Sequence, residues 1–263
     1  MKRMFVVVLT FGLLLATTAA FAHSDAPTAD PILTEASEKF ATASFNYDID
    51  MNIDFGGTDF DASGTGAVQA PVSGFLNIGA KSRGLSLNLN GDLEGLPVNV
   101  DTVALGNTLY MNGLLGDGWV AAPASVFAGG AVVNPRRMDD SFLTVTRESD
   151  DTINGAAVAV FAFDYDLSDP AAQTLIAGAT AGMDSMGGFI ATGQQAASIF
   201  AAGDLTMVQY IDLNTKEVRR IEIDFDVDDT DLEIQIDIPE GYSSNITITA
   251  PEDAQSLSDA LNE

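Results

Sequence analysis

The residues of this chain that could do chemistry are almost all carboxylates. It has 38 Asp and Glu residues, a single histidine (His23) and no cysteine. Triads of the Ser-His-Asp or Cys-His type and multi-histidine metal sites are therefore excluded or nearly so. Carboxylate pairs that hydrolyse glycosides stay open, because many acids are available. Most of these acids stand at polar positions of alternating segments, where a solvated face explains them better. We therefore predict a protein that is not an enzyme, with no catalytic residue, metal or cofactor.

Two acidic runs resemble the start of a calcium-binding loop. The run from Asp224 has carboxylates at odd positions, but its sixth position is Asp229 rather than Gly and its twelfth is Gln235 rather than Glu. The run from Asp48 departs from the pattern likewise. Both runs are better interpreted as strand faces, and a weak Ca²⁺ site at the turn 228–231 is left as an alternative.

The acids belong to segments in which large apolar residues alternate with Asp or Asn. Residues 45–55 read Phe-Asn-Tyr-Asp-Ile-Asp-Met-Asn-Ile-Asp-Phe, and similar alternation returns at 85–90, 160–167, 221–227 and 232–238. Side chains of a strand point alternately to its two faces, so each segment has one apolar face and one acidic face. The pattern predicts an antiparallel sheet that is wetted on one face and covered on the other.

Cap and turn residues place the other elements around these strands. Asp30-Pro31 and Asp169-Pro170 each predict the start of a helix. Asn154-Gly155 predicts a hairpin turn. The predicted helices are 31–44, 171–181 and 194–202, with a loop over 121–137, a short helical turn within 136–145 and a frayed helix in the tail 251–263. The predicted further strands are 60–70, 73–80, 84–93, 97–105, 108–111, 156–167, 205–213, 217–228, 231–238 and 245–249.

The N-terminus has the features of an export signal. Lys2 and Arg3 precede an apolar stretch, and Ala20-Phe-Ala22 fits a small-x-small cleavage site. The apolar stretch is short for a membrane span. We therefore predict an extracytoplasmic protein (periplasmic, cell-wall or secreted) with no stable membrane anchor after cleavage near Ala22. The predicted organisation is a signal peptide over 1–22, a flexible leader over 23–30, a single half-barrel domain over 31–250 and a C-terminal tail over 251–263.

The formal net charge of −27 at pH 7 limits the possible partners. Nucleic acid is excluded, because binding it requires a basic surface. Attachment to anionic lipid headgroups is disfavoured for the same reason. We interpret the charge as a device for solubility outside the cell.

Several local patterns together resemble a known family. They are the helix-then-strand opening 32–55, Gly-Asn-Thr-Leu-Tyr-Met at 106–111 with Gly-Trp-Val at 118–120, and the stretches 154–161, 208–221 and 246–251. In these the chain resembles the LolA/LolB-like superfamily of extracytoplasmic lipid carriers, closest to the LppX/LprG-type lipoprotein family but without its lipobox cysteine. The resemblance implies an α+β, mainly β fold, in which helices cover the concave face of a curved antiparallel half-barrel sheet of about ten strands. It also implies acyl chains or lipoproteins held between sheet and helices.

The predicted ligand site combines the apolar sheet face with a mobile helical lid. We expect an exported soluble carrier or binding protein for a hydrophobic ligand, such as lipid or lipoprotein acyl chains. The Gly- and Met-rich segment 182–190 suits a lid, because Met adapts to irregular apolar surfaces and glycines permit movement. The alternative is a tightly packed core without a cavity, which would favour a structural or interaction module of the cell envelope or surface with a protein partner. The predicted lining residues are Phe45, Tyr47, Ile49, Met51, Ile53, Phe55, Phe161, Phe163, Tyr165, Met183, Met186 and Phe189.

Overall fold

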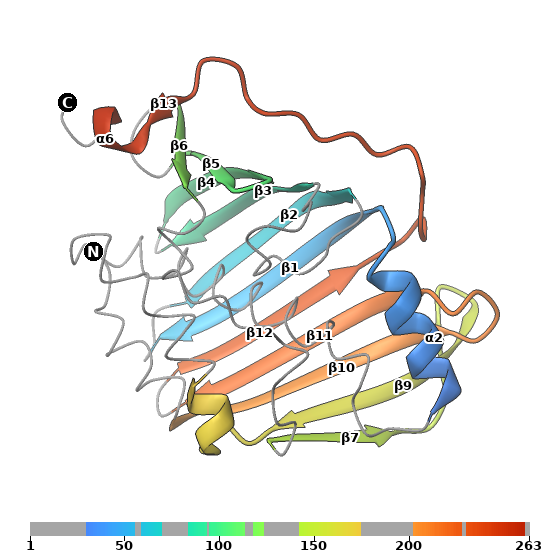
Figure 1. Cartoon of the computed structure of the whole chain (residues 1–263). Helices are drawn as coiled ribbons and strands as arrows, with labels where there is room; N and C mark the ends of the chain where they lie inside the picture. The colour runs from blue at the N-terminus through green and yellow to red at the C-terminus, as the bar shows by residue number, and fades with distance from the viewer. Residues whose placement is uncertain are drawn as a thin grey trace.

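The structure is a computed structural model, and all of its described strands belong to one open sheet. It describes residues 30–55, 59–69, 84–93, 95–113, 118–123, 142–174, 202–227 and 230–260. The strand order is β13-β6-β5-β4-β3-β2-β1-β12-β11-β10-β9-β7, and β8 also pairs with β9 (Figure 1). All pairs are antiparallel except β13 with β6. The 13 strands form a curved, unclosed sheet, as the half-barrel prediction requires.

The strand bounds follow the alternating segments closely. The N-terminal half of the sheet is a meander of β1 to β6, and β12 returns beside β1 to join it to β9–β11. The strands are β1 Phe45–Phe55, β2 Asp59–Gln69, β3 Gly84–Leu93, β4 Leu96–Leu105, β5 Thr108–Asn112, β6 Trp119–Pro123, β7 Leu143–Arg147, β8 Asp151–Ile153, β9 Ala156–Tyr165, β10 Asp204–Asp212, β11 Val218–Val227, β12 Thr230–Asp237 and β13 Gln255–Ser256.

Helix α2 (Pro31–Phe40) packs across one end of the sheet (Figure 1). Its N-cap Asp30 accepts a hydrogen bond from the Ile32 N–H at 2.8 Å, and Pro31 occupies the first turn, as predicted. Its apolar side buries Leu33 and Ala36 in the core. The helix ends at Phe40 rather than at the predicted residue 44, because the chain turns there to enter β1.

The second Asp-Pro pair also begins a helix, as predicted. Asp169 accepts a hydrogen bond from the Ala171 N–H at 2.7 Å, and residues 170–174 are helical. The Asn154-Gly155 turn is confirmed too, because both residues have positive φ (51° and 83°), as a type I′ hairpin requires. The predicted strand 73–80, the rest of helix 171–181 and all but the last residue of helix 194–202 lie outside the described residues.

Three sequence predictions are wrong. Residues 121–123, predicted as loop, end strand β6, which pairs with β5. Residues 143–145, predicted as part of a helical turn, begin β7, where alternating Leu, Thr and Val favour a strand. Residues 245–249 are not a ladder strand. The chain leaves the sheet after β12 and runs along its end, so that only β13 rejoins it (Figure 1), followed by the short helix α6 (Leu257–Ala260).

Loss of the α2 N-cap has a measurable cost. Besides capping the helix, Asp30 pairs with Arg147 of β7 at 3.0 Å. We expect Asp30→Ala to lower the free energy of unfolding by about 1 to 2 kcal/mol, measured by urea denaturation. Asp150 pairs with the same arginine at 3.0 Å but caps no helix, so Asp150→Ala is the matched control. An equal loss in the two variants would show that the ion pair, not the cap, stabilises this corner.

Candidate functional site

The apolar face of the sheet gathers most of the predicted lining residues. On β1, the side chains of Phe45, Tyr47, Ile49, Met51 and Ile53 are all buried. Across the next strand, Ile49 lies opposite Ile236 and Met51 lies opposite Ile234 of β12. Residues that are opposite in an antiparallel pair point to the same face. The apolar side of β1 therefore continues onto β12.

Strand β9 supplies the far part of this face. Phe161 and Phe163 are buried, and Tyr165 is partly buried against the same core. The register places Tyr165 opposite Leu205 of β10 and Leu143 of β7. The predicted residues of β1 and β9 thus share one hydrophobic cluster. The side chain of Phe55 and all of Met183, Met186 and Phe189 lie outside the described residues.

Sequence reasoning missed several residues of the same face. They belong to strands that the alternation identified and whose apolar positions were not assigned to the site. The signal that would have found them is the two-residue period itself, extended to every strand. They include Phe60, Leu87, Leu89, Met207, Ile221, Ile223, Phe225, Leu232, Ile234 and Ile236.

Polar groups interrupt this apolar face at few places. Gln209 is buried opposite Phe161 and Ile221, and Thr102 is buried opposite Leu87. The Thr102 hydroxyl is enclosed and has no hydrogen-bond partner. These groups mark positions where the face can form a directed contact rather than only an apolar one.

The buried tyrosines differ in how their hydroxyls are satisfied. The Tyr47 hydroxyl donates to the Ser86 carbonyl at 3.0 Å, and the Tyr242 hydroxyl accepts from the Val218 N–H at 3.0 Å. The Tyr165 hydroxyl is enclosed and has no hydrogen-bond partner among the residues that the structure describes. Burial raises the pKa of all three hydroxyls above the ordinary value, so they are neutral at physiological pH.

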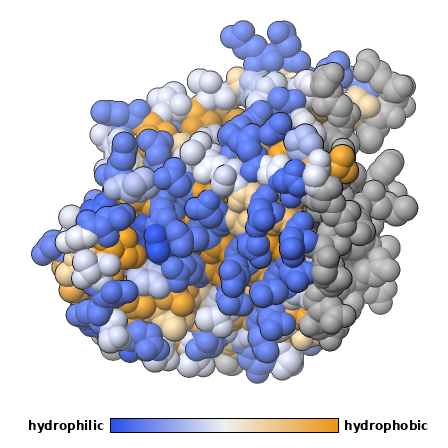
Figure 2. All heavy atoms as spheres, turned by 180° about the vertical axis from the view of Figure 1, so that it is seen from behind, coloured by the Kyte–Doolittle hydropathy of each residue, from blue (hydrophilic) through white to orange (hydrophobic). Residues whose placement is uncertain are grey.

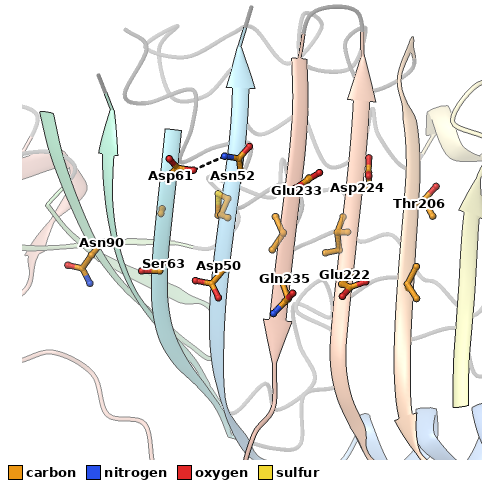
Figure 3. A pocket seen from close by; sticks show the side chains of 15 residues that line it. Asp50, Asn52, Asp61, Ser63, Asn90, Thr206, Glu222, Asp224, Glu233 and Gln235 are labelled. Atoms are coloured by element: carbon orange, nitrogen blue, oxygen red, sulfur yellow. Dashed lines mark hydrogen bonds between the residues drawn. The ribbon is translucent and has the colours of Figure 1, made fainter. Parts of the chain in front are cut away.

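The opposite face of the sheet is polar and carries a shallow groove of about 910 Å³. Figure 2 shows this side covered mainly by hydrophilic side chains, with apolar atoms between them. In Figure 3 the polar side chains of β1, β2, β3, β10, β11 and β12 stand along the groove, and Asn52 donates to Asp61 at 2.6 Å. Of the predicted lining residues only Met51 borders it, and its side chain is buried.

Strand register aligns five aspartates across one end of this polar face. Each lies opposite the next on adjacent strands, about 4.8 Å apart. Like charges directly opposite each other destabilise a sheet. From β2 to β10 the row is Asp59, Asp54, Asp231, Asp226 and Asp204.

The charges of this row affect the neighbouring Asp224. Its pKa is raised, first by desolvation and then by the charges of Asp231 and Asp226. Among the described residues no group of three or more His, Cys, Asp or Glu is suited to hold a metal ion. The alternative Ca²⁺ turn at 228–231 is only partly described, since Asp228 and Asp229 lie outside the described residues.

The aspartate row predicts that salt stabilises the protein. Screening weakens repulsion between exposed charges, so we expect the free energy of unfolding to rise by about 1 to 2 kcal/mol from 0.01 to 0.5 M NaCl. Asp226→Asn, in the row between Asp231 and Asp204, should reduce this salt dependence. Asp101→Asn is the control, because Asp101 accepts a hydrogen bond from an asparagine. Equal salt slopes for both variants would contradict a role of the row.

No helix in the described part of the chain is long and apolar enough to cross a membrane. No family model matches the sequence, and neither does any curated protein sequence.

Solved structures resemble the chain in fold at low identity. The lipoprotein LppX of Mycobacterium tuberculosis is 10% identical with a TM-score of 0.45, covering 89% of this chain and 99% of its own. LprF of Mycobacterium bovis is 16% identical with a TM-score of 0.40, covering 84% and 95%. A LolA superfamily protein of Nitrosomonas europaea is 8% identical with a TM-score of 0.28, covering 86% and 96%. The families named from the sequence are thus among the similar solved structures.

Proposed function

We propose that this protein is an exported, non-enzymatic carrier or binding protein for a hydrophobic ligand, a lipid or the acyl chains of a lipoprotein. The observation that supports the proposal is the continuous apolar face of the sheet. It extends from Phe60 on β2 through β1, β12, β11 and β10 to Phe163 on β9. A face of this extent must be covered by helices, by a second sheet or by a ligand.

The described helical residues contribute little cover to this face. Helix α2 buries Leu33 and Ala36 and packs Phe40 against the cluster at one end of the sheet, and the helical turn after Asp169 buries Ala172. The alanines fill the space over a curved sheet poorly. In the proposal the ligand shares the rest of the face with a lid that includes Met183, Met186 and Phe189.

The energetics of an acyl ligand fit a carrier. Moving about 30 methylenes out of water is worth roughly 24 kcal/mol, which exceeds the practical ceiling of non-covalent affinity. Exchange between a bilayer and an apolar face is nearly neutral, because both environments are apolar. An apolar binding site inside a chain of net charge −27 therefore suits transfer of a lipid between membranes. The lipid can leave the site for a bilayer without a chemical step that drives its release.

The first test is whether the purified protein holds lipid. We expect native mass spectrometry, with lipid extraction of protein from its own host, to find lipid at a fixed stoichiometry. We also expect the lipid-free protein to take up palmitate or phospholipid. A clean apo mass without uptake would favour the alternative, a solid-core structural or interaction module of the cell envelope.

A matched pair of variants on edge strand β7 tests which face of the sheet binds the ligand. Val145 packs against the apolar cluster beside Phe163, whereas its neighbour Thr144 is exposed on the other face. We expect Val145→Glu to weaken palmitate binding at least tenfold, because the ligand would desolvate a carboxylate. Thr144→Glu should bind like the wild type. Equal affinities in the two variants would place the ligand elsewhere.

A further inference from the structure

The Tyr165 hydroxyl is a polar group without a partner on the apolar face. Its oxygen is fully enclosed and forms no hydrogen bond with any described residue, although the edge of the residue reaches the surface. The large majority of buried polar side-chain atoms in proteins are paired. Leaving one unpaired lowers stability, because the group has lost its hydrogen bonds to water and gained none in return. A hydroxyl retained at this cost calls for a partner from outside the chain.

The described neighbours of Tyr165 do not supply that partner. Leu205 and Leu143 lie opposite it on the two flanking strands, and the Phe142 ring lies 6.3 Å from its ring. On the same face of β9 the chain uses phenylalanine at 161 and 163. Phenylalanine would fill the position without an unpaired hydroxyl, so the oxygen itself is the feature that needs a reason.

Three other tyrosines contrast with Tyr165, because their hydroxyls have hydrogen-bond partners within the protein. Tyr47 and Tyr242 are bonded to backbone groups, and Tyr210 on the polar side donates to Glu222 at 2.7 Å. The fold therefore satisfies its tyrosine hydroxyls internally where it can. Tyr165 differs in standing at the last position of β9, where the strand ends beside the edge strand β7 (Figure 1).

We infer that the Tyr165 hydroxyl donates a hydrogen bond to an oxygen at the polar end of the bound ligand. This inference rests on the proposed function and narrows it. The ligand is then an amphiphile with a carbonyl or carboxylate oxygen on a long alkyl chain, rather than a pure hydrocarbon. Its chain runs from Tyr165 past Phe163 to Phe161, a distance of about 13 Å at 3.3 Å per residue.

The test compares Tyr165→Phe with the wild type on apolar probes with and without an oxygen atom. The fluorescent reporter N-phenyl-1-naphthylamine contains no oxygen, and methyl palmitate and palmitate, which do, are titrated against it by displacement. We expect Tyr165→Phe to bind the reporter as the wild type does and to bind both palmitate probes about three- to tenfold more weakly. We also expect the apo variant to melt at the same or a higher temperature, because it loses an unpaired hydroxyl.

Tyr242→Phe is the matched control, since it removes a largely buried hydroxyl that accepts its hydrogen bond from the Val218 N–H within the protein. It should melt at a lower temperature and keep the wild-type ratio of palmitate to reporter affinity. If the wild type binds no probe, the proposed function and this inference both fail. If the wild type binds all probes and Tyr165→Phe binds them equally well, the inference alone is wrong. A lower melting temperature of apo Tyr165→Phe would also overturn it, because the hydroxyl would then have a partner without ligand.

Discussion

Replacing Asp212 with alanine is expected to lower the free energy of unfolding by about 3 to 5 kcal/mol. Asp212 ends β10 and is 4% exposed. One carboxylate oxygen accepts the N–H groups of Asn214 and Thr215 at 2.8 and 3.0 Å, and the other accepts Nε and Nη2 of Arg219 at 3.3 and 3.2 Å. Alanine would leave two turn N–H groups without their acceptor, and the partly buried Arg219 guanidinium would keep only its longer ion pair with Glu217 at 3.5 Å.

Urea denaturation of Asp212→Ala, Asp212→Asn and a control variant measures this effect. Asn keeps one acceptor for the turn and loses the charge that faces Arg219, so its loss should be intermediate. Asp237→Ala is the control, because its bond to Arg220 is short (2.7 Å) while both side chains are about a quarter exposed. We expect that variant to lose only about 1 kcal/mol. Equal losses at positions 212 and 237 would contradict the role of burial.

The same network has a predictable pH dependence. Burial alone would raise the pKa of Asp212, but hydrogen bonds from Thr215, Asn214 and Arg219 outweigh it and lower the pKa. A carboxylate with a lowered folded-state pKa stabilises the fold above its unfolded pKa of about 3.9. That stability is lost as the pH falls through the folded-state pKa. The stability difference between wild type and Asp212→Asn should therefore be constant near neutrality and shrink below about pH 4.

Local patterns were sufficient to predict most of the fold. The two-residue alternation of apolar and polar side chains predicted the bounds of β1, β3 and β11 to within one residue, because each strand has one buried and one solvent-exposed face. Asp-Pro pairs fixed both helix starts through capping, which depends only on neighbouring residues. β6 and β7 were missed because each is five residues long and its own residues do not show that it pairs with β5 or with β9. Residues 245–249 alternate like a strand, yet the chain there has already left the sheet.

The sequence could predict only which face of the strands forms the site, not how its side chains are arranged across the sheet. Alternation shows which side chains of a strand point the same way, and so it grouped the apolar residues of β1 and β9. It does not give register between strands. The five-aspartate row and the opposition of Tyr165 to two leucines both arise from register. Whether a buried hydroxyl is paired also depends on register, so Tyr47 and Tyr165 look equivalent in the sequence and differ in the structure.

Gly66→Ala is expected to lower the free energy of unfolding by about 3 kcal/mol. Gly66 of β2 lies opposite Tyr47, whose ring crosses it to reach the Ser86 carbonyl. An added Cβ would lie 2.2 Å from Tyr47 Cζ, 2.3 Å from its hydroxyl and 2.5 Å from the Ser86 oxygen. The ring must therefore move, which loses a hydrogen bond worth about 1 kcal/mol and adds about 1 to 3 kcal/mol of overpacking.

A double-mutant cycle separates the tyrosine from the backbone clash. In a Tyr47→Leu background, Gly66→Ala should cost at least about 1 kcal/mol less, because the ring is no longer in the way. Gly64→Ala is the control on the same strand, since the three atoms nearest to its Cβ would be backbone atoms of Asn88 and Leu89. Its cost should not depend on position 47, and equal coupling for both glycines would contradict the ring's role.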